Sequence, residues 1–229
     1  MPKHIATVIN VRQETSSVKV FSLKLSSHFV FKSGQFVMLT FLGYVDKTGK
    51  GSRRAYSIAS APHDKLLELA IKIHSAPSFS SELDKLKVGD TVEVDGPFGK
   101  FFVDETKPEI LFIAGGTGIA PLISMIKYLC HLTKRPKMKL LFGIKHVSDI
   151  IYKKEIDDLK ARSLLDVVYC LSQEKCEGFM DCRVTAVLSQ HVNATQDVYL
   201  CGLPEFVVDV VAMLESLGVS KERIHKEQW

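Results

Sequence analysis

The stretch that decides the fold is Ile110-Leu111-Phe112-Ile113-Ala114-Gly115-Gly116-Thr117-Gly118-Ile119-Ala120-Pro121. Its five leading apolar residues are typical of a fully buried strand, and the glycines behind them indicate a tight turn. Pro121 suits the first turn of a helix. Glycines let the backbone approach a pyrophosphate, and a helix N-terminus presents unpaired N–H groups to an anion. The stretch therefore predicts a strand, a phosphate-binding turn and a helix, although a turn without a ligand would give the same pattern.

Downstream of this stretch, short buried strands alternate with longer amphipathic helices. The predicted strands cover 110–114, 139–142, 166–171 and 198–201, and the predicted helices cover 121–132, 148–161, 183–190 and 204–217. This alternation predicts a parallel sheet with helices on both faces. We expect this α/β domain to occupy residues 105–229.

Upstream, before the polar stretch 104–108, the pattern is that of β-strands. Six strands are predicted at 4–11, 19–25, 35–42, 54–60, 66–74 and 91–95, with one helix at 80–86 that Ser80 could cap. Closing such an antiparallel sheet removes its exposed edges. We therefore expect a six-stranded antiparallel barrel in residues 1–104.

Composition restricts the class of protein. With 229 residues, 46% hydrophobic and 24% charged, the chain is typical of a globular protein. No apolar run reaches the roughly 20 residues that span a bilayer, and the N-terminus lacks the features of a secretory signal, so we expect no membrane span and a cytoplasmic protein. The net charge of +4 is mild, and the basic run 134–139 lacks interleaved aromatics, so no nucleic-acid partner is expected.

Five cysteines, an odd number without a pairing pattern, indicate a reducing compartment rather than a disulfide framework. Cys170, Cys176 and Cys182 are spaced too widely and evenly for an iron–sulfur or zinc site. We expect no metal centre and no fused iron–sulfur module. Cys201 differs because it ends a predicted strand, ahead of Gly202 and Pro204, where parallel sheets bind ligands. A site role is favoured there over that of a small buried hydrophobe.

A second motif, Arg54-Ala55-Tyr56-Ser57, lies on a predicted strand of the first half. Arg54 and Tyr56 would point to one side and Ser57 to the other, unless a bulge intervenes. A guanidinium can hold a phosphate, a phenol ring can stack on an isoalloxazine, and a hydroxyl can reach a ring nitrogen. The three groups suit a flavin. An edge strand with an exposed arginine and a half-buried tyrosine is the alternative.

In chain order, the segments 53–60, 96–99, 116–121 and 198–204 resemble the ferredoxin-NADP reductase superfamily. The resemblance spans nearly the whole chain and implies a flavin-binding barrel followed by a nicotinamide-nucleotide domain. It implies Arg54 on the flavin phosphate, Tyr56 against the ring and Ser57 near its N5 atom. It also implies a turn at 96–99 that closes the barrel beneath the flavin, and a Cys201 thiol beside the nicotinamide.

The last residues, Glu227-Gln228-Trp229, resemble the ending of that superfamily. The resemblance implies a Glu227 carboxylate near the active site and a Trp229 ring that covers the flavin face where nicotinamide must lie. The alternative for Trp229 is a frayed tail. Pro77 departs from the family, which commonly has a glycine there to help hold the flavin pyrophosphate. FAD is favoured over FMN.

The resemblance implies a set of site residues. The catalytic candidates are Ser57, Cys201, Glu227 and Trp229. The cofactor-binding candidates are Arg54, Ala55, Tyr56, Ser57, Ile71, Lys72, Ser80, Gly115, Gly116, Thr117, Gly118, Pro121, Lys145, Ser172, Arg183, Cys201, Gly202, Pro204 and Trp229. Lys145 and Arg183 could pair with a 2′-phosphate, whereas Gln173 supplies no charge, so NADH or dual use with NADPH is expected.

The implied reaction is hydride transfer from NAD(P)H to bound FAD, followed by electron transfer to a separate acceptor such as a ferredoxin, a flavodoxin or an oxygenase component. A slightly basic protein suits an acidic carrier. Two alternatives stay open. One is an NAD(P)H:flavin reductase that binds flavin loosely as a substrate. The other is a non-catalytic flavin-binding electron-transfer subunit of a complex.

Overall fold

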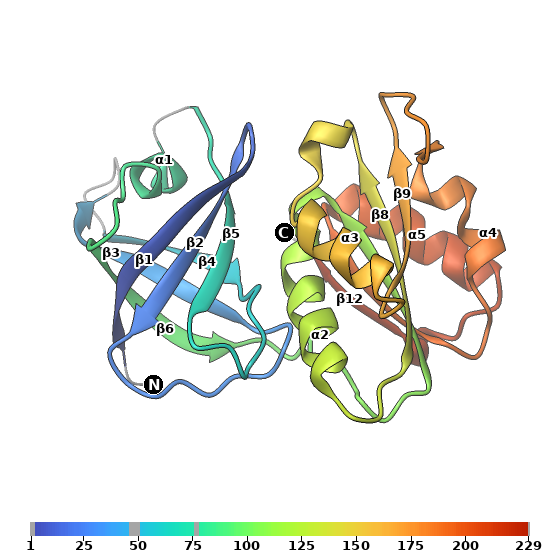
Figure 1. The fold of residues 1–229 in the computed structure, drawn as a ribbon, viewed down its shortest axis with the longest axis horizontal. Coiled ribbons are helices and arrows are strands. Elements are labelled where there is room, and N and C mark those ends of the chain that lie inside the picture. Colours follow the sequence, from blue (N-terminus) through green and yellow to red (C-terminus); the bar gives the residue numbers. More distant parts are fainter. Residues whose placement is uncertain (1–2, 46–50, 76–77, 229) are drawn as a thin grey trace.

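The computed structural model describes residues 3–45, 51–75 and 78–228, whose strands form two six-stranded sheets (Figure 1). The first sheet has the order β4-β3-β6-β1-β2-β5, and every neighbouring pair is antiparallel. A bridge between Ile58 and Leu69 joins the two ends of this order. The predicted barrel is thereby confirmed. Its strands are β1 (His4–Thr15), β2 (Val18–Leu25), β3 (Phe36–Val45), β4 (Gly51–Ser57), β5 (Leu67–Lys72) and β6 (Thr91–Phe98).

The barrel interior follows from the alternation of side chains along its strands. Its core includes Ala6 and Val8 of β1 and Val92 and Val94 of β6, all almost completely buried. Helix α1 (Phe79–Leu83) contributes the side chains of Phe79 and Leu83 to that core.

The cap of helix α1 differs from the prediction. Ser78, not Ser80, is the N-cap residue, and its hydroxyl accepts a hydrogen bond from the Ser81 N–H. Ser81 completes a capping box by accepting from the Ser78 N–H at 2.8 Å. The Ser80 hydroxyl has another partner, the His74 N–H at 3.1 Å. The prediction was wrong because a run of serines offers several possible caps.

The second sheet is parallel throughout, in the order β10-β9-β8-β7-β11-β12. Along β7, Phe112 belongs to the core that contains helices α2 and α3, whereas Leu111 and Ile113 belong to the core that contains α5. Helices on both faces are thereby confirmed. The strands are β7 (Glu109–Gly115), β8 (Lys137–Ile144), β9 (Asp166–Leu171), β10 (Met180–Asp181), β11 (Asp197–Gly202) and β12 (Ile224–Gln228), and the helices are α2 (Ile119–His131), α3 (Lys153–Ala161), α4 (Leu188–His191) and α5 (Pro204–Ser216).

In the second half, two predicted helices are much shorter than expected. The helix predicted at 148–161 begins only at Lys153, because Tyr152 has a left-handed backbone (φ 59°) and a fully buried side chain. The helix predicted at 183–190 is divided into a 3-10 turn, Val184–Ala186, and the short α4. Within the described ranges, no helix is long and apolar enough to cross a membrane.

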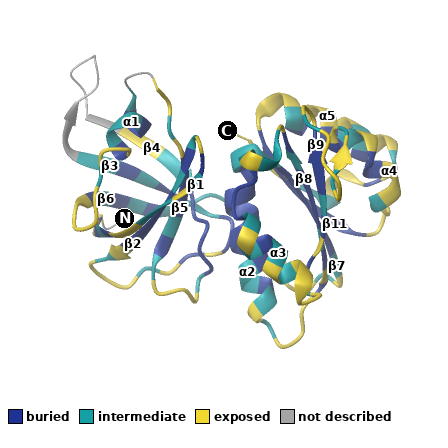
Figure 2. Cartoon of the chain, turned by 45° about the horizontal axis from the view of Figure 1, so that its top comes forward, coloured by how far each residue is buried: buried dark blue, intermediate teal, exposed yellow. Residues whose placement is uncertain are grey.

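Helix α2 lies between the barrel and the second sheet (Figures 1 and 2). Val18 and Val20 of β2 and Ala70 of β5 belong to the same buried cluster as Ile119 and Ile123 of α2. The apolar core is therefore continuous from the outer surface of the barrel into the second half of the chain. This shared core fixes the position of the barrel relative to the second sheet. It therefore also fixes the end of β4 relative to the loop that follows β7.

Candidate functional site

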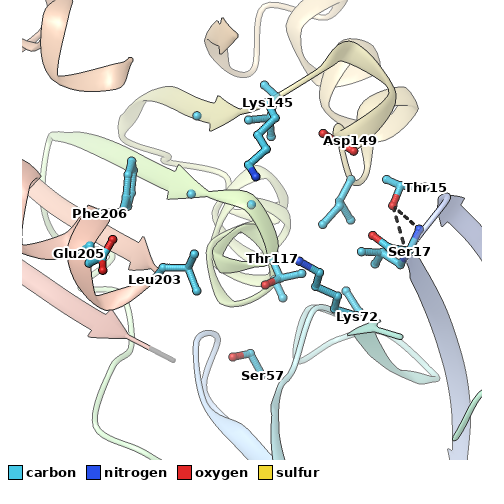
Figure 3. Close-up of a pocket in the computed structure, with 18 of the residues that line it drawn as sticks. Thr15, Ser17, Ser57, Lys72, Thr117, Lys145, Asp149, Leu203, Glu205 and Phe206 are labelled. Carbon is cyan, nitrogen blue, oxygen red and sulfur yellow. Dashed lines mark hydrogen bonds between the residues drawn. The ribbon is translucent and has the colours of Figure 1, made fainter. Parts of the chain in front are cut away.

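A cavity of about 1210 Å³ lies between the two sheets and is lined by residues from both (Figure 3). The barrel contributes the end of β4 and part of β5. The second half contributes the loop after β7, the ends of β8 and β9, and the first turns of α5. The predicted site residues that line it are Arg54, Ala55, Tyr56, Ser57, Lys72, Ser80, Gly115, Gly116, Thr117, Lys145, Ser172 and Arg183.

On the barrel side, Arg54 and Tyr56 both lie next to the ring of Phe79 in helix α1. The Arg54 guanidinium lies 5.9 Å from the centre of the Phe79 ring, and the Tyr56 ring is 6.4 Å away, nearly parallel to it at 27°. Burial raises the pKa of Tyr56 to about 12, although the charge of Arg54 acts in the opposite direction, so the phenol stays neutral. Sequence reasoning missed Phe79. Its position as an aromatic residue in the first turn of a short helix was the available signal.

Ser57 is the polar group that most clearly requires a ligand. Its side chain is only 7% exposed, it lines the cavity, and its Oγ atom is buried without a hydrogen-bond partner among the described residues. A buried hydroxyl without a partner costs about 1–3 kcal/mol. A polar ligand atom in the cavity would remove that cost, which is what a flavin heteroatom beside Ser57 would do.

On the opposite side, the glycine loop supplies backbone rather than side chains. Gly116 has φ 54°, and a Cβ at this position would meet no atom within 4 Å. A Cβ at Gly118, by contrast, would lie 2.2 Å from the carbonyl oxygen of Cys201, and one at Gly115 would lie 2.8 Å from the Phe206 ring. The loop therefore needs glycine because it packs directly on the end of β11.

The loop lies where the strand order reverses, since β7 has β8 on one side and β11 on the other. Parallel sheets bind ligands at this point. Helix α2 starts at Ile119, immediately after the loop, so its unpaired N–H groups face the same region. These features suit a pyrophosphate, and its binding at this loop stays a prediction.

Two lysines reach into the cavity from opposite sides. Lys72 extends from β5 and Lys145 from the end of β8, and both amino groups point toward the region of Thr117 (Figure 3). This arrangement suits a ligand that carries phosphate groups. Other lining residues went unpredicted as site residues, among them Thr15, Ser17, Leu203, Glu205 and Phe206. In the part of the chain that is described, no three His, Cys, Asp or Glu side chains are grouped as a metal site would require.

The remaining predicted residues do not line the cavity. Ile71 belongs to the barrel core, whereas Gly118, Pro121, Gly202 and Pro204 lie around the base of the glycine loop and the start of α5. Cys201 is completely buried, and its backbone carbonyl lies against Gly118. Pro77 and Trp229 lie outside the described residues.

Glu227 comes close to Cys201 through a strand that was not predicted. Strand β12 pairs with β11 so that Glu227 is in register with Cys201. The Glu227 Oε2 atom is buried without a hydrogen-bond partner among the described residues. Burial raises the pKa of this carboxyl group to about 7. Near neutral pH it can therefore hold or release a proton.

Comparison with known proteins gives two family models that match in order along the chain. The oxidoreductase FAD-binding domain matches residues 6–103, and the oxidoreductase NAD-binding domain matches residues 112–212. A ferredoxin NADP⁺ reductase from Neisseria gonorrhoeae, solved with bound FAD and NADP, superposes with a TM-score of 0.85. It is 20% identical, and the match covers 100% of this chain and 99% of that one. The superposition shows that the fold is shared.

Two curated relatives carry more sequence similarity. One subunit of the Na⁺-translocating NADH-quinone reductase of Haemophilus influenzae (strain 86-028NP) is 33% identical over 202 residues, which are 79% of this chain and 49% of the relative. The chain thus spans about half the length of that relative. The electron transfer component of toluate 1,2-dioxygenase from Pseudomonas putida is 28% identical over 235 residues. The match covers 98% of this chain and 67% of that relative.

These matches confirm the resemblance that the sequence motifs indicated. The barrel corresponds to the FAD-binding model and the parallel sheet to the NAD-binding model, in the same order as in the solved reductase. The chain is therefore an oxidoreductase built of an FAD-binding domain followed by an NAD-binding domain, with the fold of the ferredoxin-NADP reductases.

Proposed function

We propose that this protein is an NAD(P)H-dependent reductase that delivers electrons to a separate acceptor protein. The observation that carries the proposal is the cavity that brings Ser57 of the barrel and the Gly116–Gly118 loop to the same space. When bound, the flavin supplies the redox chemistry, because it accepts a hydride from the reduced nicotinamide and passes electrons on singly. The contribution of the chain is to bind, to align and to exclude water.

Three residues of β4 would hold the flavin. Arg54 would pair with its phosphate, since an arginine hydrogen bond to phosphate is charge-assisted and directional. The neutral ring of Tyr56 would pack against the isoalloxazine. Ser57 would donate its unsatisfied O–H to a ring heteroatom. The Ser57 hydroxyl is the most informative of these groups, because it is already buried and without a partner among the described residues.

The nucleotide would bind along the glycine loop. Backbone N–H groups at Gly116 and Thr117 and the start of α2 would hold its pyrophosphate. Lys145 and Arg183 line the same cavity at its nucleotide side and would tolerate a 2′-phosphate, whereas Gln173 beside them adds no charge. We therefore propose NADH as a substrate, with NADPH accepted as well.

Glu227 and Cys201 would act on the reacting end of the nicotinamide. Cys201, buried at the end of β11, would shape the place where that ring lies. The Glu227 carboxyl, whose pKa is raised to about 7, would hold a proton at Oε2 or release it close to neutral pH. The role of Trp229 stays a prediction, as does a cytoplasmic location.

The acceptor is proposed from the relatives and the charge of the chain. One relative is an electron transfer component of a dioxygenase, and another is a subunit of an NADH-quinone reductase. The net charge of +4 favours encounter with an acidic carrier. A ferredoxin, a flavodoxin or an oxygenase component is the class of acceptor that fits.

Anaerobic titration tests the proposal. The purified protein is expected to be yellow, to contain FAD, and to lose its flavin absorbance on addition of NADH, with NADPH as a second reductant. Reoxidation by an added ferredoxin, faster than by free flavin, would support the separate acceptor. A colourless protein that reduces only added flavin would instead support the flavin reductase alternative. A yellow protein that neither nucleotide bleaches would support the non-catalytic subunit.

A further inference from the structure

Helix α2 joins the glycine loop to the surface of the barrel. Its side chains at positions 124, 127 and 131 are spaced to share one face of the helix. The Ser124 hydroxyl donates a 2.6 Å hydrogen bond to the carbonyl oxygen of Ser60, and the His131 ring stacks on His63 with centroids 4.1 Å apart. Lys127 lies between these two contacts. The helix that begins at the phosphate-binding loop is thus attached to the barrel along one face.

Lys127 connects carboxylates from both halves of the chain. Its Nζ atom lies 3.2 Å from Oε2 of Glu68 on β5 and 2.8 Å from Oε2 of Glu155 on α3. Burial by itself would lower the pKa of Lys127, but attraction to Glu155 and Glu68 outweighs it and raises that pKa. The lysine therefore stays charged, with a side chain only 20% exposed, between two carboxylates that would otherwise repel each other.

A second cation reinforces the contact. Arg12 of β1 lies 3.2 Å from Glu155 and pairs with Glu14. Glu14 in turn accepts a 2.7 Å hydrogen bond from the N–H of Tyr152, the residue that precedes helix α3. A barrel carboxylate thus caps a helix of the second half. The group contains three carboxylates and two cations, so losing one cation leaves an excess of two negative charges on side chains that are 12% (Glu14), 20% (Glu68) and 33% (Glu155) exposed.

Strand β5 links this cluster to the cavity. Glu68, Ala70 and Lys72 alternate with Leu67, Leu69 and Ile71, which belong to the barrel core, so the first three face away from that core. Glu68 is in the cluster, Ala70 is in the core shared with α2, and Lys72 lines the cavity. A shift of the barrel surface against α2 would therefore move the flavin side of the cavity relative to the glycine loop.

We propose that Lys127 is a positioning residue for the reaction: its charge offsets the repulsion between Glu68 of the barrel and Glu155 of the nucleotide-binding half, and this fixes the separation between the flavin site at Ser57 and the glycine loop. The inference rests on the proposed function, since it concerns the alignment of the two ligands within that cavity. Lys127 itself lines no part of the cavity, so its effect is on alignment rather than on contact.

The test uses the FAD-loaded protein and the substitution Lys127→Met. The rate of flavin reduction by NADH at saturation is expected to fall about 10- to 100-fold, because a misplacement of about 1 Å can cost 10²-fold. The dissociation constants of FAD and NADH should change less than about threefold, since each ligand keeps its own contacts. Amide hydrogen exchange in β5 and α2 should become faster, a readout that does not depend on activity.

Three further variants separate positioning from simple loss of stability. Lys139→Met removes a 3.1 Å pair with Asp166 inside the second half and should leave the reduction rate unchanged. Lys127→Arg keeps the charge and should retain most of the rate. The triple variant Lys127→Met, Glu68→Gln, Glu155→Gln removes the two partly buried like charges and should return the rate to within about fivefold of the wild type.

A wild-type rate in Lys127→Met, or an equal loss in Lys139→Met, would overturn the inference. So would unchanged hydrogen exchange in β5 and α2. A triple variant as slow as Lys127→Met would also overturn it, because repulsion between the two carboxylates would then not be the cause. Failure of the proposed function looks different, since the wild-type flavin itself would not be reduced by NADH or NADPH.

Discussion

The two sides of the cavity are built in different ways. The barrel side presents side chains, with Arg54, Tyr56 and Ser57 on one strand, whereas the centre of the opposite side presents the backbone of residues 115–117, which Gly118 joins to helix α2. Side chains can be removed one at a time without moving the strand that carries them. A backbone loop packed on β11 cannot accept even a methyl group at Gly118. Changes on the barrel side should therefore act mainly on binding, while changes in the loop should disturb both folding and binding.

The largest expected effect is that of Gly118→Ala. Its Cβ would lie 2.2 Å from the oxygen and 2.4 Å from the carbon of the Cys201 carbonyl, so the loop or β11 must move. We expect a loss of about 3 kcal/mol of unfolding free energy and no measurable NADH binding. Gly116→Ala is the comparison, because that position has open space and costs only about 1 kcal/mol for its left-handed backbone. Equal effects of the two substitutions in thermal unfolding would contradict the steric explanation.

Arg54→Ala should act on flavin binding alone. A charge-assisted hydrogen bond contributes about 1.5–3 kcal/mol, so FAD affinity should fall roughly 10- to 100-fold. The apoprotein should unfold at nearly the same temperature, since the Arg54 side chain is exposed. Arg53→Ala is the matched control. The guanidinium of Arg53 lies 3.8 Å from Asp95, and Arg53 does not line the cavity. Fluorimetric titration of FAD into both apoproteins would decide, and an equal loss in both would remove Arg54 from the site.

Glu227 should make stability depend on pH. Its pKa is raised to about 7 in the folded chain, against about 4.3 when unfolded, so the folded state holds a proton that the unfolded state has lost between these values. Unfolding free energy should therefore decrease as the pH rises from about 4.5 to 7, by on the order of 2 kcal/mol. Glu227→Gln should stabilise the protein at pH 8 and not at pH 4.5, measured by denaturant unfolding. The exposed Glu177→Gln is the control, and a Glu227→Gln variant with the wild-type pH profile would show that this carboxyl is not the source.

The smallest expected effect is a gain in stability from Ser57→Ala. Removing the unsatisfied Oγ should stabilise the apoprotein by up to about 1 kcal/mol while it slows flavin reduction. Ser60→Ala is the opposite control, because the Ser60 hydroxyl accepts a 3.0 Å hydrogen bond from the Glu68 N–H and its loss should be destabilising. Thermal unfolding of both apoproteins tests the pair. Destabilisation by Ser57→Ala would mean that its hydroxyl has a partner in the folded chain.

The sequence predicted the parts of the fold that depend on local pattern. The buried strand and glycine turn at 110–118 and the alternation along β1 and β6 follow from side-chain periods that are visible without a structure. Strand β12 could not be predicted in this way, because Ile224 is followed by His225, Lys226 and Glu227, and only pairing with β11 makes this segment a strand. Edge strands of mixed polarity carry no periodic signal.

The sequence predicted many of the residues that line the cavity, but not how they pack against one another. The motif around Tyr56 and the glycine loop identified both sides of the cavity, yet the packing of Phe206 over Gly115 joins residues far apart in sequence. The start of α3 was also misplaced, since the N–H of Tyr152 is satisfied by Glu14 from the barrel. Such contacts depend on tertiary structure, and local propensity does not encode them.

The shared apolar core has a consequence for protein engineering. Val18, Val20 and Ala70 of the barrel are buried against α2, so each half would expose an apolar surface if it were produced alone. A chimera that takes its flavin module from one relative and its nucleotide module from another would join two unmatched surfaces. Hybrid reductases of this type should therefore require the α2 contact residues to be transplanted together with the barrel.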